Sequence, residues 1–386
     1  MKWPVVKPMP VVQDEKFLSI LEPLRGRSAW LSATSFLILL NLLIALAMLV
    51  VNSGRAPAAS SLQLDWGANF GPATTDGEWW RLATAMFLHF GPLHLTMNML
   101  ALWDSGRLVE RWFGTSRFLV LYVASGLTGN LLSLVVHGDR AISGGASGAI
   151  FGIYGAFLVF LLSERKRLHA GEFRWMFWGA AAFAIFALAF GFLIPGIDNA
   201  AHLGGLLTGA GVGFALLVPP NELIEPSRQS ARWLVGVVLV GVIAFLVASI
   251  PKPRYPWSDE QQARGEIREF IGADMRTNAR LRALLSEQGT AGSSFEQLAG
   301  RIEAEVVHPY EQSFEQLSGL HISPDAPSAA TLERLRRYAE TRRDATQALA
   351  EGIREKDPQR VRDALDAVRR TTSTNQKVPS GSSTSP

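Results

Sequence analysis

The chain has 386 residues, of which 48% are apolar and 18% are charged. Its formal net charge of +3 is too small to indicate a nucleic-acid partner. It contains no cysteine, which excludes disulfide bonds and thiolate metal sites. Apolar residues crowd into residues 30–250, whereas residues 251–386 are polar and charged. We therefore expect a membrane part followed by a soluble part.

Seven stretches predict membrane helices, each of which needs about 20 mostly apolar residues. Residues 1–29 are too long and too mixed for a signal peptide, so we expect a cytoplasmic segment followed by a retained helix. The second stretch is the weakest because polar residues interrupt it, but a bundle can satisfy such groups. The predicted helices are Ala33–Val51, Leu82–Trp103, Phe118–Val136, Gly148–Leu162, Trp175–Ile194, Ala200–Val218 and Trp233–Ile250.

The positions of lysine and arginine predict the orientation, because these residues favour the cytoplasmic side. With the N-terminus inside, the inner segments carry 14 of them, and the outer connections before the seventh helix carry 3. We therefore expect the N-terminus in the cytoplasm and the C-terminal region on the outer side of the cell's inner membrane. The first outer loop, Asn52–Arg81, holds Trp66, Phe70, Trp79 and Trp80, which predicts that it lies partly in the membrane interface.

The C-terminal region opens with a proline-rich linker and continues with helical patterns over residues 259–288, 294–318 and 328–370. The sequence thus predicts an all-α, polytopic membrane bundle with a soluble helical region. Its parts are a cytoplasmic segment (1–29), a six-helix core (30–218), a seventh membrane helix (233–250), an outer helical region (251–370) and a disordered tail (371–386).

Polar residues inside membrane helices are costly and indicate function. His94 and Asn98 are four residues apart and share a helix face. Ser147 stands in the run Gly145-Ala146-Ser147-Gly148, and His202 begins the sixth helix. The predicted topology runs these three helices from outside to inside, so His94, Ser147 and His202 share one depth near the outer surface. A cavity at that depth would admit the water that hydrolysis needs.

These residue types suit nucleophilic catalysis. A serine hydroxyl is a weak nucleophile until a base takes its proton, and His202 is the histidine of the sixth helix. Unpaired N–H groups at the start of the serine helix suit an oxyanion, and His94 and Asn98 offer further donors. Small residues at spacing four in the fourth and sixth helices predict close packing that brings serine and base within hydrogen-bond reach, and Phe151 is placed to stack on the imidazole. The nearest acid in sequence, Asp198, sits at the loop end, which favours a dyad.

Together these motifs resemble the rhomboid proteases over roughly Ala33–Val218. The matching pieces are Trp80-Arg81, His89-Phe-Gly-Pro-Leu-His94 with Asn98, Gly145-Ala-Ser-Gly148, and Ala201-His-Leu-Gly-Gly205 with Gly209. The resemblance implies cleavage of transmembrane-anchored proteins near the outer membrane face, without metal or cofactor. It implies Ser147 as nucleophile, His202 as base, and His94, Asn98 and the Ser147 N–H as oxyanion donors beside Gly145. It further implies a mobile fifth helix beside which substrate enters. Phe151 departs mildly from the family, many members of which have tyrosine.

Other interpretations remain open at this point. His94 and Asn98 also suit an interhelical hydrogen bond that only stabilises the bundle, and His89 suits a structural role as well as an oxyanion role. Arg81, Trp79 and Trp80 are expected to anchor the chain at the membrane interface, and a structural role in the first loop is compatible with that. The alternative functions are a non-catalytic rhomboid-like protein that binds or escorts client membrane proteins, and a small-solute transporter. The first typically lacks the serine or the histidine, and the second would be expected to show internal repeats. Besides substrates, membrane lipids are the expected partners; the substrate and the oligomeric state are not indicated.

Overall fold

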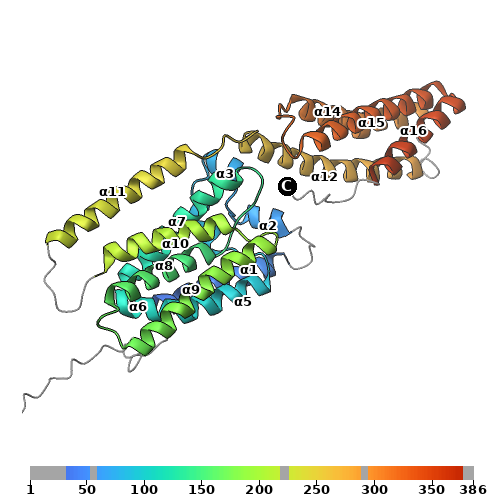
Figure 1. Cartoon of the computed structure of the whole chain (residues 1–386). Coiled ribbons are helices and arrows are strands. Elements are labelled where there is room, and N and C mark those ends of the chain that lie inside the picture. The colour runs from blue at the N-terminus through green and yellow to red at the C-terminus, as the bar shows by residue number, and fades with distance from the viewer. Residues whose placement is uncertain (1–31, 53–58, 218–225, 288–293, 377–386) are drawn as a thin grey trace, which may run out of the picture. The chain divides into compact units, whose positions relative to one another are not determined.

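The computed structural model describes residues 32–52, 59–217, 226–287 and 294–376, and their regular secondary structure is helical (Figure 1). The predicted cytoplasmic segment, residues 1–29, lies outside the described residues. The chain divides into two compact units. The first comprises Met1–Phe70 with Trp80–Pro251, and the second comprises Gly71–Trp79 with Lys252–Pro386. The predicted class, an all-α polytopic membrane bundle with a helical C-terminal region, is confirmed.

Each predicted membrane segment has a helical counterpart in the first unit. Among the described residues, four helices are long and apolar enough to cross a membrane: α1 (Ala33–Val51), α7 (Thr115–His137), α8 (Ser147–Glu164) and α9 (Ala170–Leu193). The sixth and seventh predicted segments correspond to α10 (Asn199–Leu216) and α11 (Pro226–Ala248). α11 packs on α7 through Leu246, which lies with Leu131 and Leu134 in one apolar cluster. The chain is therefore a multi-pass membrane protein.

The second membrane helix begins ten residues later than the prediction of Leu82–Trp103. Arg81–Thr84 (α4) and Ala85–Phe87 (η2) are short turns of helix, and the longer helix begins at Pro92. Gly91 takes a φ of 139°, and Pro92 suits a helix start because its missing N–H has no helical partner to lose. The helix continues as α5 (Pro92–Ala101), a π-helical turn η3 (Leu102–Gly106) and α6 (Arg107–Phe113). His94 therefore lies in the first turn of its helix.

The segment before this helix is held by a buried arginine. Arg81 is 3% exposed, and its guanidinium donates to the carbonyls of Leu64 (2.7 Å), near the end of α2 (Ala59–Asp65), and of Ala68 (3.1 Å), just after that helix. The neighbouring Trp79 and Trp80 side chains are 41% and 50% exposed, as membrane-interface anchors would be. Arg81 itself is buried and bonded to the loop backbone rather than exposed as an interfacial anchor. The short helix α3 (Gly71–Thr75) belongs to the second unit.

Helices α8 and α10 lie side by side and touch through their backbones (Figure 1). A Cβ placed on Gly205 would lie 1.9 Å from the Gly148 carbonyl oxygen, and one on Gly209 would lie 2.0 Å from that of Gly152. Only glycine fits at such separations. The close packing predicted from the small-residue rows is confirmed, and it places the start of α8 against the start of α10.

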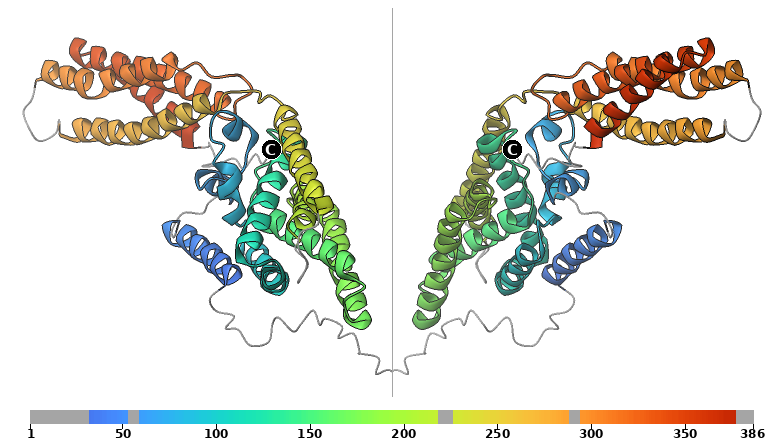
Figure 2. Two further views of the ribbon diagram at one scale, coloured as in Figure 1. Left: turned by 90° about the vertical axis from the view of Figure 1, so that its left-hand side faces the viewer. Right: turned by 90° about the vertical axis from the view of Figure 1, so that its right-hand side faces the viewer.

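The second unit is built from helices that lie along one another (Figure 2). They are α12 (Trp257–Glu287), α13 (Phe295–Ile302), η4 (Glu303–Val307), α14 (His308–Gly319), α15 (Ala329–Glu355) and α16 (Pro358–Gln376). The pattern over 328–370 was predicted as one helix, but the chain breaks at Lys356, whose φ is 58°, just before Pro358. α16 also continues beyond residue 370 into the segment expected to be disordered, and residues 377–386 lie outside the described residues.

Candidate active site

Ser147 is the first residue of α8 and directly follows a tight turn that contains Gly145. Gly145 has a φ of +143°, a conformation that L side chains rarely adopt, and its N–H donates to the Ala85 carbonyl at 2.8 Å. Hydrogen bonding within this helix begins with the Ile150 N–H, which donates to the Ala146 carbonyl at 3.0 Å. The N–H groups from Ser147 to Ala149 precede that bond, as at any helix start. They supply donors beside the Ser147 hydroxyl.

His202 occupies the first turn of α10, where its N–H donates to the Asp198 carbonyl at 3.1 Å. Its side chain is buried, with 7% exposed, and stacks on Phe151 with ring centroids 4.3 Å apart and planes 13° apart. The predicted stacking is confirmed. A Cβ on Gly148, the residue after Ser147, would lie 3.2 Å from the carbonyl oxygen of Ala201, the residue before His202. The serine and histidine therefore stand at one level on two touching helices.

The hydrogen bond predicted between the two side chains is not present in the described structure. In the described part of the chain, the structure records no hydrogen bond between Ser147 and His202, and the imidazole Nδ1 is buried without a hydrogen-bond partner. The sequence predicts that the pair lies within hydrogen-bond reach. Such bonds between catalytic groups are often long before substrate binds and tighten in the complex. Phe151 fixes the face of the imidazole while leaving its ring nitrogens unoccupied.

His94 lies at the serine turn. A Cβ built on Gly145 would lie 2.9 Å from His94 Cε1, 3.0 Å from its Nε2 and 3.7 Å from the Ser147 hydroxyl oxygen. Its other ring nitrogen, Nδ1, lies 3.4 Å from the donating N–H of Phe90. This bond leaves Nε2 to carry the ring proton and to serve as a donor facing the turn. The structure thus brings His94, Gly145 and Ser147 together.

Asn98 and His89 lie behind His94. Asn98 is buried, and its amide donates to the His94 carbonyl at 2.9 Å, so one of its two N–H groups is used within its own helix. The His89 ring meets the His94 ring edge to face at 5.1 Å, and neither of its ring nitrogens has a recorded partner in the described residues. The Gln63 amide holds the His89 carbonyl at 2.7 Å. His89 therefore touches His94 rather than the serine.

The carboxylate of Asp198, near the site, accepts several hydrogen bonds that the sequence did not predict. Asp198 caps α10, and its oxygens accept hydrogen bonds from the Ser133 hydroxyl (2.5 Å), the Ser143 hydroxyl (2.5 Å) and the Ala201 N–H (2.9 Å). Burial favours a higher pKa for Asp198, but these bonds and one from His137 outweigh it and lower the pKa to about 2. The carboxylate is therefore ionised at neutral pH, and it is directed to these donors rather than to the imidazole.

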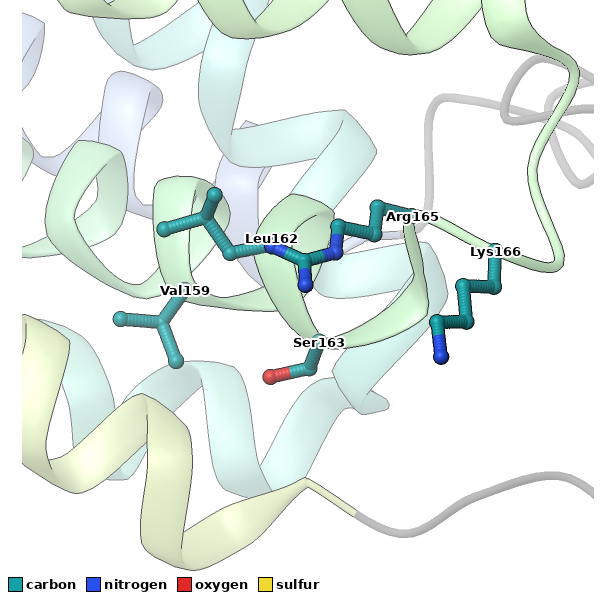
Figure 3. A pocket seen from close by; sticks show the side chains of 5 residues that line it. All are labelled: Val159, Leu162, Ser163, Arg165 and Lys166. Atoms are coloured by element: carbon teal, nitrogen blue, oxygen red, sulfur yellow. The ribbon is translucent and has the colours of Figure 1, made fainter.

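A shallow pocket lies at the opposite end of α8 from Ser147 (Figure 3). It is lined by Val159, Leu162, Ser163, Arg165 and Lys166. At 1.5 Å per residue, Ser163 stands about 24 Å along the helix from Ser147. The pocket is thus separate from the serine–histidine pair, at the basic end of the helix that the charge pattern predicts to be cytoplasmic.

Comparisons with known proteins decide the family. Residues 76–219 match the model of the Rhomboid domain. The chain is also 30% identical over 287 residues to the Rhomboid protease AarA of Providencia stuartii, covering 69% of this chain and 98% of that protein. The chain belongs to the rhomboid family. The resemblance read from the motifs is thereby confirmed, and the matched domain of this rhomboid contains all eight predicted site residues, namely Arg81, His89, His94, Asn98, Gly145, Ser147, Phe151 and His202.

Other relatives of this rhomboid are matched over part of their length. It is 36% identical over 221 residues to the Rhomboid protease GluP of Bacillus subtilis, covering 57% of this chain and 41% of that protein. It is also 36% identical over 190 residues to the mitochondrial RHOMBOID-like protein 6 of Arabidopsis thaliana, covering 47% of this chain and 58% of that protein. The rhomboid described here thus spans about half the length of these two relatives.

Proposed function

We propose that the chain is an intramembrane serine endopeptidase that cleaves transmembrane-anchored proteins near the outer membrane face. Membership of the rhomboid family supports the reaction class, and two of the relatives above are named rhomboid proteases. The observation that carries the proposal for this chain is the stacked pair of Phe151 and His202 beside the start of the serine helix. A histidine held by its face, with its nitrogens unoccupied, is suited to act as a base for the neighbouring Ser147.

In the proposed mechanism, the Ser147 hydroxyl oxygen attacks the scissile carbonyl while His202 takes its proton. The proton then passes to the leaving amine, the C–N bond breaks, and an acyl-serine remains. Water, deprotonated by His202, hydrolyses this ester and returns the proton to Ser147. The negative charge on the carbonyl oxygen is stabilised by the backbone N–H groups at the start of α8 and by His94. Asn98 either donates its remaining amide N–H to the same oxygen or holds His94 in place through the hydrogen bond to the His94 carbonyl.

Substrate entry is proposed beside α9, the fifth membrane helix. Among its described residues only Ala180 and Ala184 are buried, so this helix has little packing to lose when it moves. Its inner contacts include Phe183, which stacks on Tyr154 at 4.4 Å. Near its outer end, the Asn199 amide donates to the Leu188 carbonyl at 3.1 Å. An entering transmembrane segment would therefore displace few contacts to reach Ser147.

The proposal is tested with purified protein and a model substrate that carries one transmembrane helix. Wild-type protein should release the ectodomain, whereas Ser147→Ala and His202→Ala should each abolish release. Full activity in Ser147→Ala would contradict the proposal. A comparison of membrane proteomes from cells with wild type or Ser147→Ala would then identify the natural substrates by their newly cleaved ectodomains.

We further propose that the chain resides in the inner membrane with a cytoplasmic N-terminus, as the lysine and arginine distribution indicates. The chain has no cysteine, so a single introduced cysteine is a unique label site. Arg140→Cys lies in the connection between α7 and α8 on the outer side, and Lys166→Cys follows α8 on the inner side. An impermeant maleimide should label Arg140→Cys and spare Lys166→Cys in intact cells. The reverse pattern would invert the orientation and place Ser147 at the cytoplasmic face.

A further inference from the structure

The Asp198 carboxylate connects three parts of the membrane bundle. It caps α10 through the Ala201 N–H, one residue before His202. Its Oδ2 accepts from Ser133 in α7 and from Ser143 in the connection that leads to Ser147. Its Oδ1 lies 3.4 Å from Nε2 of His137, the last residue of α7. One partly buried carboxylate thus holds the start of the histidine helix, the end of α7 and the segment that carries the serine.

Ser143 is fixed on its other side as well. Its backbone N–H and carbonyl pair with the carbonyl and N–H of Asn69, each at 2.8 Å. The Asn69 amide donates to the Asn130 carbonyl at 2.9 Å, and the Asn130 amide donates to the Leu82 carbonyl at 2.7 Å. The backbone of Ser143 is therefore bonded to Asn69, and the side chain of Ser143 is bonded to Asp198. Four residues after this double attachment, Ser147 begins α8.

We propose, on the basis of the function proposed above, that Asp198 is a positioning residue that sets the placement of Ser147 relative to His202. It does so by holding Ser143 and the first turn of α10 on the same carboxylate. It is not a third catalytic group, because its partners among the described residues are Ser133, Ser143, Ala201 and His137, and no bond to His202 is recorded. A misplacement of about 1 Å in reacting groups costs up to 10²-fold in rate, so loss of these hydrogen bonds should slow the reaction measurably.

A matched pair of variants isolates this role. Ser143→Ala and Ser133→Ala each remove one hydroxyl from the same oxygen of Asp198, and both side chains are buried. Ser143 lies in the connection that leads directly into Ser147, whereas Ser133 lies within α7. A general loss of stability would therefore affect both variants alike, and a loss of positioning would affect Ser143→Ala selectively.

The readouts are kcat and KM on the transmembrane model substrate, the labelling rate of Ser147 by a fluorophosphonate, and the thermal midpoint. Ser143→Ala should lose about 10-fold in kcat and in labelling rate with KM unchanged, and Ser133→Ala should lose less than about 3-fold. Ser143→Thr restores the hydroxyl on an extended backbone that tolerates a β-branched residue, so it should return to within about 2-fold of wild type.

The outcomes separate this inference from the proposed function. If wild-type protein neither cleaves nor labels, the proposed function fails. If wild-type protein is active and the two serine variants lose activity equally, or Ser143→Thr is as slow as Ser143→Ala, the positioning role of Asp198 is wrong while the protease function stands. Selective loss in Ser143→Ala with rescue by Ser143→Thr supports the inference.

Discussion

The ring of Phe151 lies flat against the imidazole of His202, with centroids 4.3 Å apart and an interplanar angle of 13°. Phe151 stands one turn beyond Ser147 on α8, and His202 stands in the first turn of α10. The contact therefore spans the interface between the helix of the proposed nucleophile and the helix of the proposed base. The same ring also meets Phe183 of α9 at 6.4 Å.

Phe151→Ala should lower kcat by about 10-fold, because the imidazole loses the surface that fixes its orientation. Phe151→Tyr keeps the ring and should stay near the wild-type rate. Phe157→Ala is the matched control: Phe157 is buried on the same helix and stacks on Phe160 rather than on His202. Steady-state cleavage of a transmembrane substrate measures the effect. Equal losses of kcat in the two alanine variants would show that Phe151 contributes only to packing.

Gly205→Ala should destabilise the bundle strongly, because its Cβ would lie 1.9 Å from the Gly148 carbonyl oxygen and the two backbones must separate. Overpacking of this kind typically costs about 1–3 kcal/mol, and backbone overlap places this case at the upper end. Gly211→Ala on the same helix is the control, since its Cβ would meet Val235 at an ordinary 3.9 Å. Thermal unfolding in detergent should show a lower midpoint for the first variant alone. Similar midpoints would show that α8 and α10 pack less tightly than described.

His94→Ala and Asn98→Ala should each lower kcat by about 10²-fold, the usual scale for one oxyanion donor. His94 lies beside Gly145 at the serine turn, and Asn98 donates to the His94 carbonyl. Thr96→Ala provides the control, because Thr96 is exposed on the same helix and its hydroxyl bonds only the Pro92 carbonyl in the described structure. Unchanged kcat in both test variants would assign them to bundle stability alone.

The contribution of Asp198 to the free energy of unfolding should decrease as the pH becomes acidic. Its pKa in the folded protein is about 2, below the ordinary value of 3.8, so its carboxylate stabilises the fold above about pH 4 and loses this effect as pH falls toward 2. The shift corresponds to about 2 kcal/mol. Wild type and Asp198→Asn should therefore differ more in thermal midpoint at about pH 5, where the carboxylate is ionised and its partner His137 is protonated, than at about pH 3. A difference that is equal at both pH values would contradict the role of the charge.

The sequence predicted the helices from local periodicity, and the same periodicity placed Phe151 one turn beyond Ser147; its pairing with His202 followed only once the fourth and sixth helices were expected to pack together. Residues four apart share a helix face, so the small-residue rows and the aromatic ring could be placed from spacing alone. The start of the second helix was missed because apolar residues continue from Leu82 to Phe90 and conceal it. The Gly91-Pro92 pair was the signal that marks it, as Pro358 was for the break between α15 and α16.

The Asp198 network could not be predicted in the same way. Its partners Ser133 and Ser143 are 65 and 55 residues distant in sequence, and serine is common in membrane helices for packing alone. Asp198 was noticed only for its nearness to His202, whereas its contacts depend on how α7 and the loop before Ser147 fold around it.

The most direct test of the account is covalent labelling of the purified protein with a fluorophosphonate, followed by peptide mapping. Only a serine activated by a neighbouring base reacts rapidly, so the account predicts one modified residue, Ser147, and loss of the label in both Ser147→Ala and His202→Ala. Labelling that persists in His202→Ala at the wild-type rate, or that maps to another serine, would contradict the pairing of Ser147 with His202.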